Sequence, residues 1–311
     1  MKRHMAIFAV LLAALGCGKK QTVTIFHADA LTVPMNQIIA QFEKDNPGIK
    51  IHAESHGSVL CSNLAKERSC DILAVADARI IKGMQPQYAD WCATFATNEM
   101  VIAYSQKSKY GAEITADNWY RILTRPDVKF AHSNPEVDPA GYWTLILWQL
   151  ADLQYPDGVD GKKVSEALEA ARTPDSIRSD AHQMLHMIES PSGIDYCFVY
   201  KNQAVEQNLQ IVRLPREINL GDPALGEHYA KAKLPPPVNR TGAPIAFAVT
   251  LLKKSANREA ATKFLSCLLG PEGRKTLRGS RAVAAFNVIS PPIVDQPESV
   301  PAEIRAVFEA K

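Results

Sequence analysis

The sequence predicts an α/β fold that is divided into two α/β lobes. Apolar runs with strand character alternate with segments of helical periodicity along most of the 311 residues. Such alternation is typical of largely parallel sheets covered by helices. About 290 residues follow the N-terminal segment, and this length exceeds what a single hydrophobic core commonly organises.

The first lobe is predicted to open with strand–helix units. Residues 23–28 form a buried strand, and 31–45 form a helix with Met35, Ile38 and Phe42 on one face. The Pro47-Gly48 pair ends this helix. The next predicted elements are a strand at 49–54, a helix at 58–67 and a buried strand at 71–76.

The second lobe is predicted to be inserted into the first. Its predicted strands are 98–105, 128–133, 194–200 and 209–215, and its predicted helices are 115–123, 139–153, 161–172 and 177–189. A proline-rich loop at 234–237 precedes a strand at 245–252 and a helix at 256–269. The chain therefore passes from lobe 1 to lobe 2 near 97–105 and returns to lobe 1 near 243–249. We expect lobe 1 to comprise 21–100 and 246–311, and lobe 2 to comprise 101–245.

The N-terminus predicts export. Lys2 and Arg3 precede an apolar run of about 11 residues, which is too short for a span of roughly 20. Cys17 follows small and apolar residues, as in a bacterial lipobox. We expect residues 1–17 to be a lipoprotein signal and lipobox, and Cys17 to anchor a periplasmic or cell-surface protein to the membrane. Later segments are not apolar enough to cross it.

Charge and motifs exclude several classes of function. The 35 basic residues fall to 33 without Lys2 and Arg3, against 33 acidic ones, so the balance does not indicate a nucleic-acid partner. The sequence has no nucleophile elbow or P-loop, so we expect no enzyme activity and no cofactor. The odd number of later cysteines leaves at least one unpaired, although Cys61 and Cys70 are close enough to form a loop. These cysteines are Cys61, Cys70, Cys92, Cys197 and Cys267.

Candidate binding residues lie where predicted strands pass into helices. Three such junctions are residues 27–30, 56–58 and 138–142, and Tyr200 ends the strand 194–200. Ligands of open α/β sheets bind at the carboxyl ends of strands, and helix N-termini attract anions. Taken singly, Asp29, Ser58 and Asp138 fit helix N-caps equally well. Convergence of several junctions on one cleft favours a binding site.

Long stretches of the chain resemble the tungstate/molybdate-binding proteins of ABC transporters, particularly their archaeal-like branch. The most specific stretches are YADWCATFATNEMVIAYS (88–105), DNWYRIL (117–123), SNPEVDPAGYWTL (133–145), LPREINLGDP (214–223), TGAPIAFAVT (241–250) and FLSCLLGPEG (264–273). The resemblance implies a type-II periplasmic binding fold, in which two α/β lobes close over a ligand. It also implies a non-enzymatic monomer that delivers a small oxyanion, tungstate or molybdate, to the permease subunits of a transporter.

The resemblance also implies ligand-binding residues. It places Ser58, the Ala140 backbone and Tyr200 among the hydrogen-bond donors, and Asp138 as a direct ligand of tungsten or molybdenum. A carboxylate repels a dianion unless it ligates the metal or is protonated, so Asp138 selects against sulfate and phosphate.

Two positions depart from the family pattern. Ala30, preceded by Asp29, stands where the family has a serine. His182 stands where the family has a second carboxylate. These three residues are therefore expected to line the pocket in altered form.

The departures leave alternatives open. The same fold would then bind another oxyanion, or a metal cation held by Asp29, Asp138 and His182. A metal-assisted hydrolase would use His182 and His186, which lie four apart on one predicted helix. A sensor lipoprotein without transport duty is a further alternative. The four tryptophans and Asp77 are expected to serve packing and capping.

Overall fold

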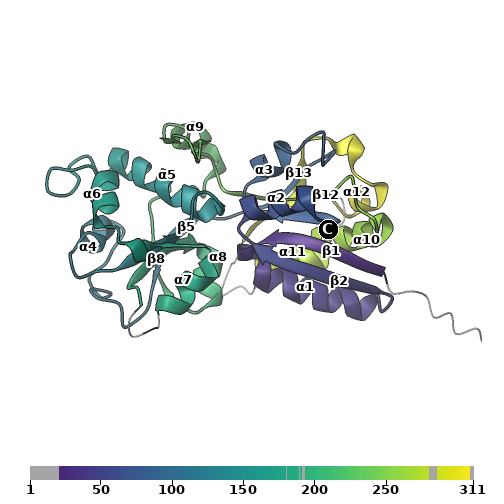
Figure 1. Cartoon of the computed structure of the whole chain (residues 1–311), viewed down its shortest axis with the longest axis horizontal. Coiled ribbons are helices and arrows are strands. Elements are labelled where there is room, and N and C mark those ends of the chain that lie inside the picture. The colour runs from purple at the N-terminus through teal and green to yellow at the C-terminus, as the bar shows by residue number, and fades with distance from the viewer. Residues whose placement is uncertain (1–20, 180, 189, 191–192, 280–285, 309–311) are drawn as a thin grey trace, which may run out of the picture.

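The computed structural model contains two sheets that lie side by side along the long axis of the molecule (Figure 1). It describes residues 21–179, 181–188, 190, 193–279 and 286–308, without the side chains of 182 and 183. One sheet has six strands in the order β13-β4-β12-β3-β1-β2, and the other has five in the order β7-β6-β8-β5-β9. We call the six-stranded sheet with its helices body 1 and the five-stranded sheet with its helices body 2.

Body 1 is built from segments at both ends of the chain. Its elements are β1 (Gln21–Ala28), the short helix η1 (Asp29–Leu31), α1 (Thr32–Asp45), β2 (Ile49–His56), α2 (Ser58–Glu67), β3 (Ile72–Val75), α3 (Ala78–Lys82), β4 (Ala93–Thr97), β12 (Ala246–Leu251), α10 (Arg258–Leu269), α11 (Pro271–Arg278), β13 (Asn287–Val294) and α12 (Ala302–Phe308). β1 pairs in parallel with β2 and β3, whereas β12 runs antiparallel to β3 and β4. The sheet is therefore mixed, and the expectation of a parallel sheet holds only for its first three strands.

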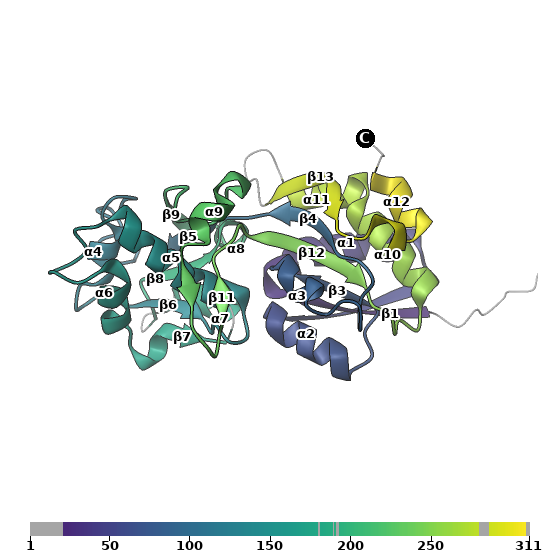
Figure 2. The same cartoon turned by 90° about the horizontal axis from the view of Figure 1, so that it is seen from above.

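Body 2 comes from the middle of the chain. Its elements are β5 (Met100–Tyr104), α4 (Trp119–Leu123), β6 (Phe130–Ser133), α5 (Pro139–Gln154), α6 (Val164–Ala171), β7 (Ile177–Arg178), α7 (Ala181–Ile188), β8 (Tyr196–Tyr200), α8 (Lys201–Glu206) and β9 (Gln210–Arg213). The helix α9 (Gly226–Tyr229) and the paired strands β10 (Lys233–Leu234) and β11 (Arg240–Thr241) follow before the chain enters β12 (Figure 2).

Both sheets are buried on two faces because their strands alternate apolar residues between two cores. In β1, Ile25 packs with α1 and α10 on one face, and Phe26 packs with α2 and α3 on the other. In β8, Phe198 packs on the α5 side and Cys197 on the α7 side. Continuous apolar runs in the sequence correspond to such doubly covered strands.

Several predicted boundaries were wrong for local reasons. The helix expected at 115–123 begins only at Trp119, because the Asn118 side chain accepts a hydrogen bond from the Thr115 N–H and holds a turn. The helix expected at 177–189 begins at Ala181, since residues 177–178 pair with β6. The edge strand β13 was missed because it contains two prolines, which edge strands tolerate.

The cysteines and tryptophans serve packing. All five cysteines after Cys17 are free thiols, so the suggested Cys61–Cys70 loop does not form. Trp91, Trp119, Trp143 and Trp148 are buried, as expected for core residues. In the described part of the chain, no helix has both the length and the apolar character needed to span a membrane.

Candidate functional site between the two bodies

The first junction ties body 1 to two helices of body 2. The Asp29 carboxylate accepts hydrogen bonds from the Ala181 N–H at 3.2 Å and from Gln203 Nε2 at 3.4 Å. The carbonyl oxygen of Ala30 accepts a hydrogen bond from Asn202 Nδ2 at 2.8 Å. Asp29 is not an N-cap, because that position belongs to Ala28. The predicted junction is therefore a contact between the bodies.

The second junction brings the start of α2 against body 2. Ser58 is fully buried, and its Oγ accepts a hydrogen bond from the Ala76 N–H at 2.9 Å. The Ser58 hydroxyl keeps its own proton, which it can donate to another acceptor. Gly57 lies so close to body 2 that an added Cβ would sit 2.4 Å from the Val137 carbonyl oxygen. Only glycine permits this approach of the two backbones.

The third junction is a capped helix start. Asp138 is the N-cap of α5, and its Oδ1 accepts a hydrogen bond from the Ala140 N–H at 3.2 Å. Pro139 occupies the first helical turn, where a missing N–H is harmless. Asp138 and Ala140 are almost completely buried. Two predicted binding groups therefore contact each other, and the N-cap interpretation is correct for Asp138.

Tyr200 supplies the fourth predicted position at the end of β8. It is fully buried, and its hydroxyl has no hydrogen-bond partner in the part of the chain that the structure describes. Burial raises the pKa of Tyr200 well above its usual value, and the charges of Asp138 and Asp29 add to this increase. The phenol therefore remains neutral and keeps a proton to donate. Asn202, two residues after Tyr200, binds the Ala30 carbonyl oxygen, so the first and fourth junctions lie close together. A Cβ added at Gly57 would sit 3.0 Å from Asp138 Cβ, so the second and third junctions do as well.

A network that sequence reasoning missed joins the bodies beside this cluster. Tyr142 of α5 donates its hydroxyl proton to Asp77 Oδ2 at 2.7 Å, and both residues are buried. Asp77 also caps α3, as expected, and binds the Arg79 guanidinium through both carboxylate oxygens. Arg79 lies 4.8 Å from the ring centroid of Trp143 and donates to the Thr241 carbonyl oxygen at 2.7 Å. The DPAGY motif carried no signal for this use of its tyrosine.

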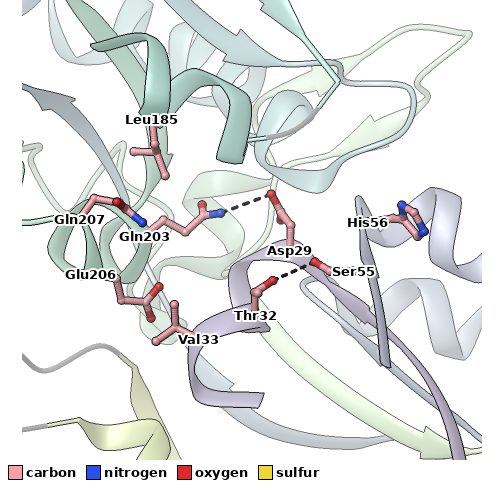
Figure 3. A pocket seen from close by; sticks show the side chains of 9 residues that line it. All are labelled: Asp29, Thr32, Val33, Ser55, His56, Leu185, Gln203, Glu206 and Gln207. Carbon is pink, nitrogen blue, oxygen red and sulfur yellow. Dashed lines mark hydrogen bonds between the residues drawn. The ribbon is translucent and has the colours of Figure 1, made fainter. Parts of the chain in front are cut away.

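A cavity of about 330 Å³ opens beside Asp29 (Figure 3). Its lining combines Asp29 and Ser55 of body 1 with Gln203 and Glu206 of α8. Asn202 donates a hydrogen bond to Glu206 at 3.1 Å, yet burial dominates and raises the pKa of Glu206 to about 7. We call this cavity the acidic pocket. Ser58, Asp138, Ala140 and Tyr200 do not line it.

Two predicted positions lie outside the described residues. Cys17 precedes the described chain, and the side chain of His182 is not described, although its backbone belongs to α7. His186 is exposed on the same helix. Within the described residues, no group of three or more histidine, cysteine, aspartate or glutamate residues is arranged to hold a metal ion.

Comparison with known proteins identifies a family and relatives that the chain resembles. Residues 23–280 match the family model described as bacterial extracellular solute-binding protein. The molybdate/tungstate-binding protein WtpA of Pyrococcus abyssi is 35% identical, over 99% of this chain and 97% of its own length. The predicted resemblance is thereby confirmed.

Solved structures share the fold at low sequence identity. The periplasmic molybdate-binding protein of Azotobacter vinelandii superposes with a TM-score of 0.59 at 18% identity, covering 85% of this chain and 98% of that one. The sulfate-binding protein SubI of Mycobacterium tuberculosis gives 0.60 at 14% identity, covering 92% and 90%. These likenesses confirm the predicted periplasmic binding fold.

Proposed function

Because the chain belongs to the bacterial extracellular solute-binding protein family, we propose that it captures tungstate or molybdate and presents it to an ABC transporter. Solute-binding proteins bind without transforming their ligand, so the expectation that the chain is not an enzyme is confirmed. The relative from Pyrococcus abyssi carries molybdate and tungstate in its name, and its similarity covers nearly the full chain. This similarity supports a metal oxyanion as the ligand.

The observation that carries the proposal is the buried Tyr200 hydroxyl beside Asp138. A buried hydroxyl without a partner costs free energy, which a ligand oxygen offsets by accepting its proton. Ser58 offers a second hydroxyl proton, since its oxygen already accepts from Ala76. Hydroxyl donors suit an oxyanion, whose oxygens act only as acceptors. They replace the solvation that the ion loses on entry.

Asp138 is the selective element of the proposed site. A carboxylate repels a buried dianion strongly, since the Coulomb energy rises in a medium of low polarity. Tungsten and molybdenum expand beyond four ligands, so a carboxylate oxygen can bind the metal centre directly. Sulfur and phosphorus expand less readily, and the same carboxylate then excludes sulfate and phosphate. In this proposal Ser58 and Tyr200 supply the hydroxyl donors that remain where Ala30 replaces the serine of the family.

Binding and delivery follow from the arrangement of the two bodies. We take body 1 and body 2 as the lobes, with 21–100 and 246–311 forming lobe 1 and 101–245 forming lobe 2. Ligand bridges them and stabilises the closed form by contacts that the open form lacks. The permease subunits then bind the closed form. In this proposal the protein is a monomer that Cys17 anchors to the outer face of the membrane through lipid.

The test exploits two Asp-Pro-Ala sequences in the chain. Asp138 caps α5, and Asp222, whose side chain is 30% exposed, likewise accepts a hydrogen bond from the Ala224 N–H at 2.9 Å. Asparagine preserves an N-cap, so either substitution keeps the helix start. We expect Asp138→Asn to weaken tungstate binding by about 100-fold, or about 3 kcal/mol, in calorimetry.

The control variant Asp222→Asn should bind tungstate as the unmodified protein does. Equal affinity of the Asp138→Asn variant and the unmodified protein would remove metal ligation from the proposal. Binding of Zn²⁺ in competition with tungstate would instead favour the cation-binding alternative.

A further inference from the structure

A second cavity, of about 500 Å³, lies where body 1 meets the segment around β11. Its walls come from α2, from α3 and from residues 239–241. Its polar lining includes Lys66, Asn63, Ser62, Arg79, Arg240 and Thr241. We call this cavity the basic pocket. The established family membership assigns it no role.

The basic pocket has an excess of positive charge. Within the described chain, its lining contains no aspartate or glutamate, and neither Lys66 nor Arg240 forms an ion pair. Lys66 reaches only the Asn63 side chain, at 3.4 Å. The charge of Arg79 is neutralised by its ion pair with Asp77, whose side chain is 4% exposed. Two cations therefore remain available to an incoming anion.

The basic pocket is connected to the buried cluster through the contact between the bodies. Arg79 lines the pocket, binds Asp77, and Asp77 accepts the hydroxyl proton of Tyr142. The Arg240 guanidinium lies over the Tyr142 ring, 5.5 Å from its centroid. Val59, which lines the basic pocket, directly follows Ser58 in α2, and Tyr142 belongs to the helix that Asp138 caps. The basic pocket and the predicted binding residues therefore share the starts of these two helices.

The acidic pocket on the α8 side has the opposite character. Asp29 and Glu206 line it, and no lysine or arginine does among the described residues. Molybdate and tungstate are dianions, so this opening repels them whereas the basic pocket attracts them. The electrostatic potential is therefore negative at the acidic pocket and positive at the basic pocket.

We infer that the basic pocket is the entry and first capture site of the dianionic oxyanion, with Lys66 and Arg240 as the residues that attract it. This inference rests on the proposed function. The oxyanion is held there before Arg79, Asp77 and Tyr142 close over it. Lys66 and Arg240 accelerate association without contributing to the final bound state.

The experiment measures association and dissociation rates of molybdate with the full chain by stopped-flow tryptophan fluorescence at pH 8. Lys66→Gln with Arg240→Gln removes both charges, and Lys66→Arg with Arg240→Lys keeps them. We expect the neutral pair to lower the association rate constant by about 5- to 10-fold at 10 mM ionic strength, with less than a 2-fold effect at 1 M. The charge-preserving pair should restore the rate. The dissociation rate should remain within about 2-fold in all variants.

A variant of the acidic pocket provides the opposite control. Glu206→Gln removes a negative charge and retains an acceptor for Asn202, and it should change the association rate by less than about 2-fold. A larger rise in that rate than the fall caused by the neutral pair would place entry at the acidic pocket and overturn the inference. An unchanged association rate in the neutral pair would also overturn it. Absence of molybdate and tungstate binding by the unmodified protein would instead contradict the proposed function.

Discussion

We expect the hydrogen bond between Tyr142 and Asp77 to contribute measurably to ligand affinity. It joins body 2 to body 1, with 2.7 Å between the two oxygens, and its donor and acceptor are 1% and 3% exposed. A hydrogen bond to a charged group contributes about 1.5–3 kcal/mol. Asp77 keeps its pairing with Arg79 when the phenol is lost, so the lower value applies. Tyr142→Phe should therefore cost about 1.5 kcal/mol in the closed form.

Because the contact spans the two bodies, its loss should appear in binding. We expect Tyr142→Phe to weaken tungstate affinity by about 10-fold, mainly through faster dissociation, since 1.4 kcal/mol corresponds to a factor of ten. Calorimetry gives the affinity, and stopped-flow displacement gives the dissociation rate. The phenylalanine ring preserves the packing against Arg240 and Trp143.

Tyr155→Phe is the matched control for this prediction. Its hydroxyl donates to the Ala116 carbonyl oxygen at 2.7 Å, a contact within body 2. This variant should lose stability in denaturant unfolding and keep its affinity for tungstate. A change in affinity below 2-fold for Tyr142→Phe, or an equal loss for Tyr155→Phe, would refute the role of this bond in closure.

Two further predictions concern the same contact between the bodies. Gly57→Ala should lower ligand affinity by about 10-fold or more, because its Cβ would lie 2.4 Å from the Val137 carbonyl oxygen. Gly48→Ala is the control and should leave the affinity unchanged, because no atom lies within 4 Å of its Cβ. Equal affinities of the two variants in calorimetry would contradict this prediction. Glu206→Gln should stabilise the protein at pH 8 by about 1–2 kcal/mol and have little effect at pH 4.5. The sign follows from the raised pKa of about 7: the folded state favours the protonated acid, so stability falls as pH rises from about 4.5 to 7. Thermal unfolding across this range checks it, and an unchanged pH profile in the variant would be evidence against it.

The elements of the fold were largely predictable because their strands are buried on both faces. β1, β3, β8 and β12 are apolar runs with clear ends, so periodicity located them. The antiparallel strands β4 and β13 were not found, since a five-residue run and a strand with two prolines carry weak local signals. Their place is determined by pairing with β12 and with each other, which are long-range contacts.

The candidate site was predictable only as far as it follows strand ends. Asp138 and Ser58 were identified because they open helices after strands. The role of Tyr142 was missed because its partner, Asp77, is 65 positions away and belongs to the other body. Asn202 was missed for the same reason, since it reaches Ala30 across 172 positions. Contacts that form only when two bodies approach leave no local pattern in the sequence.

The proposed ligand is tested most directly by calorimetric titration of the purified protein with tungstate, molybdate and sulfate under identical conditions. Tight one-to-one binding of tungstate or molybdate without sulfate binding is the predicted result, and it would also show that Ala30 and the altered position 182 are compatible with a metal oxyanion. Silence toward both metal oxyanions, or equal binding of sulfate, would contradict the role given to Asp138 and the function proposed for the chain.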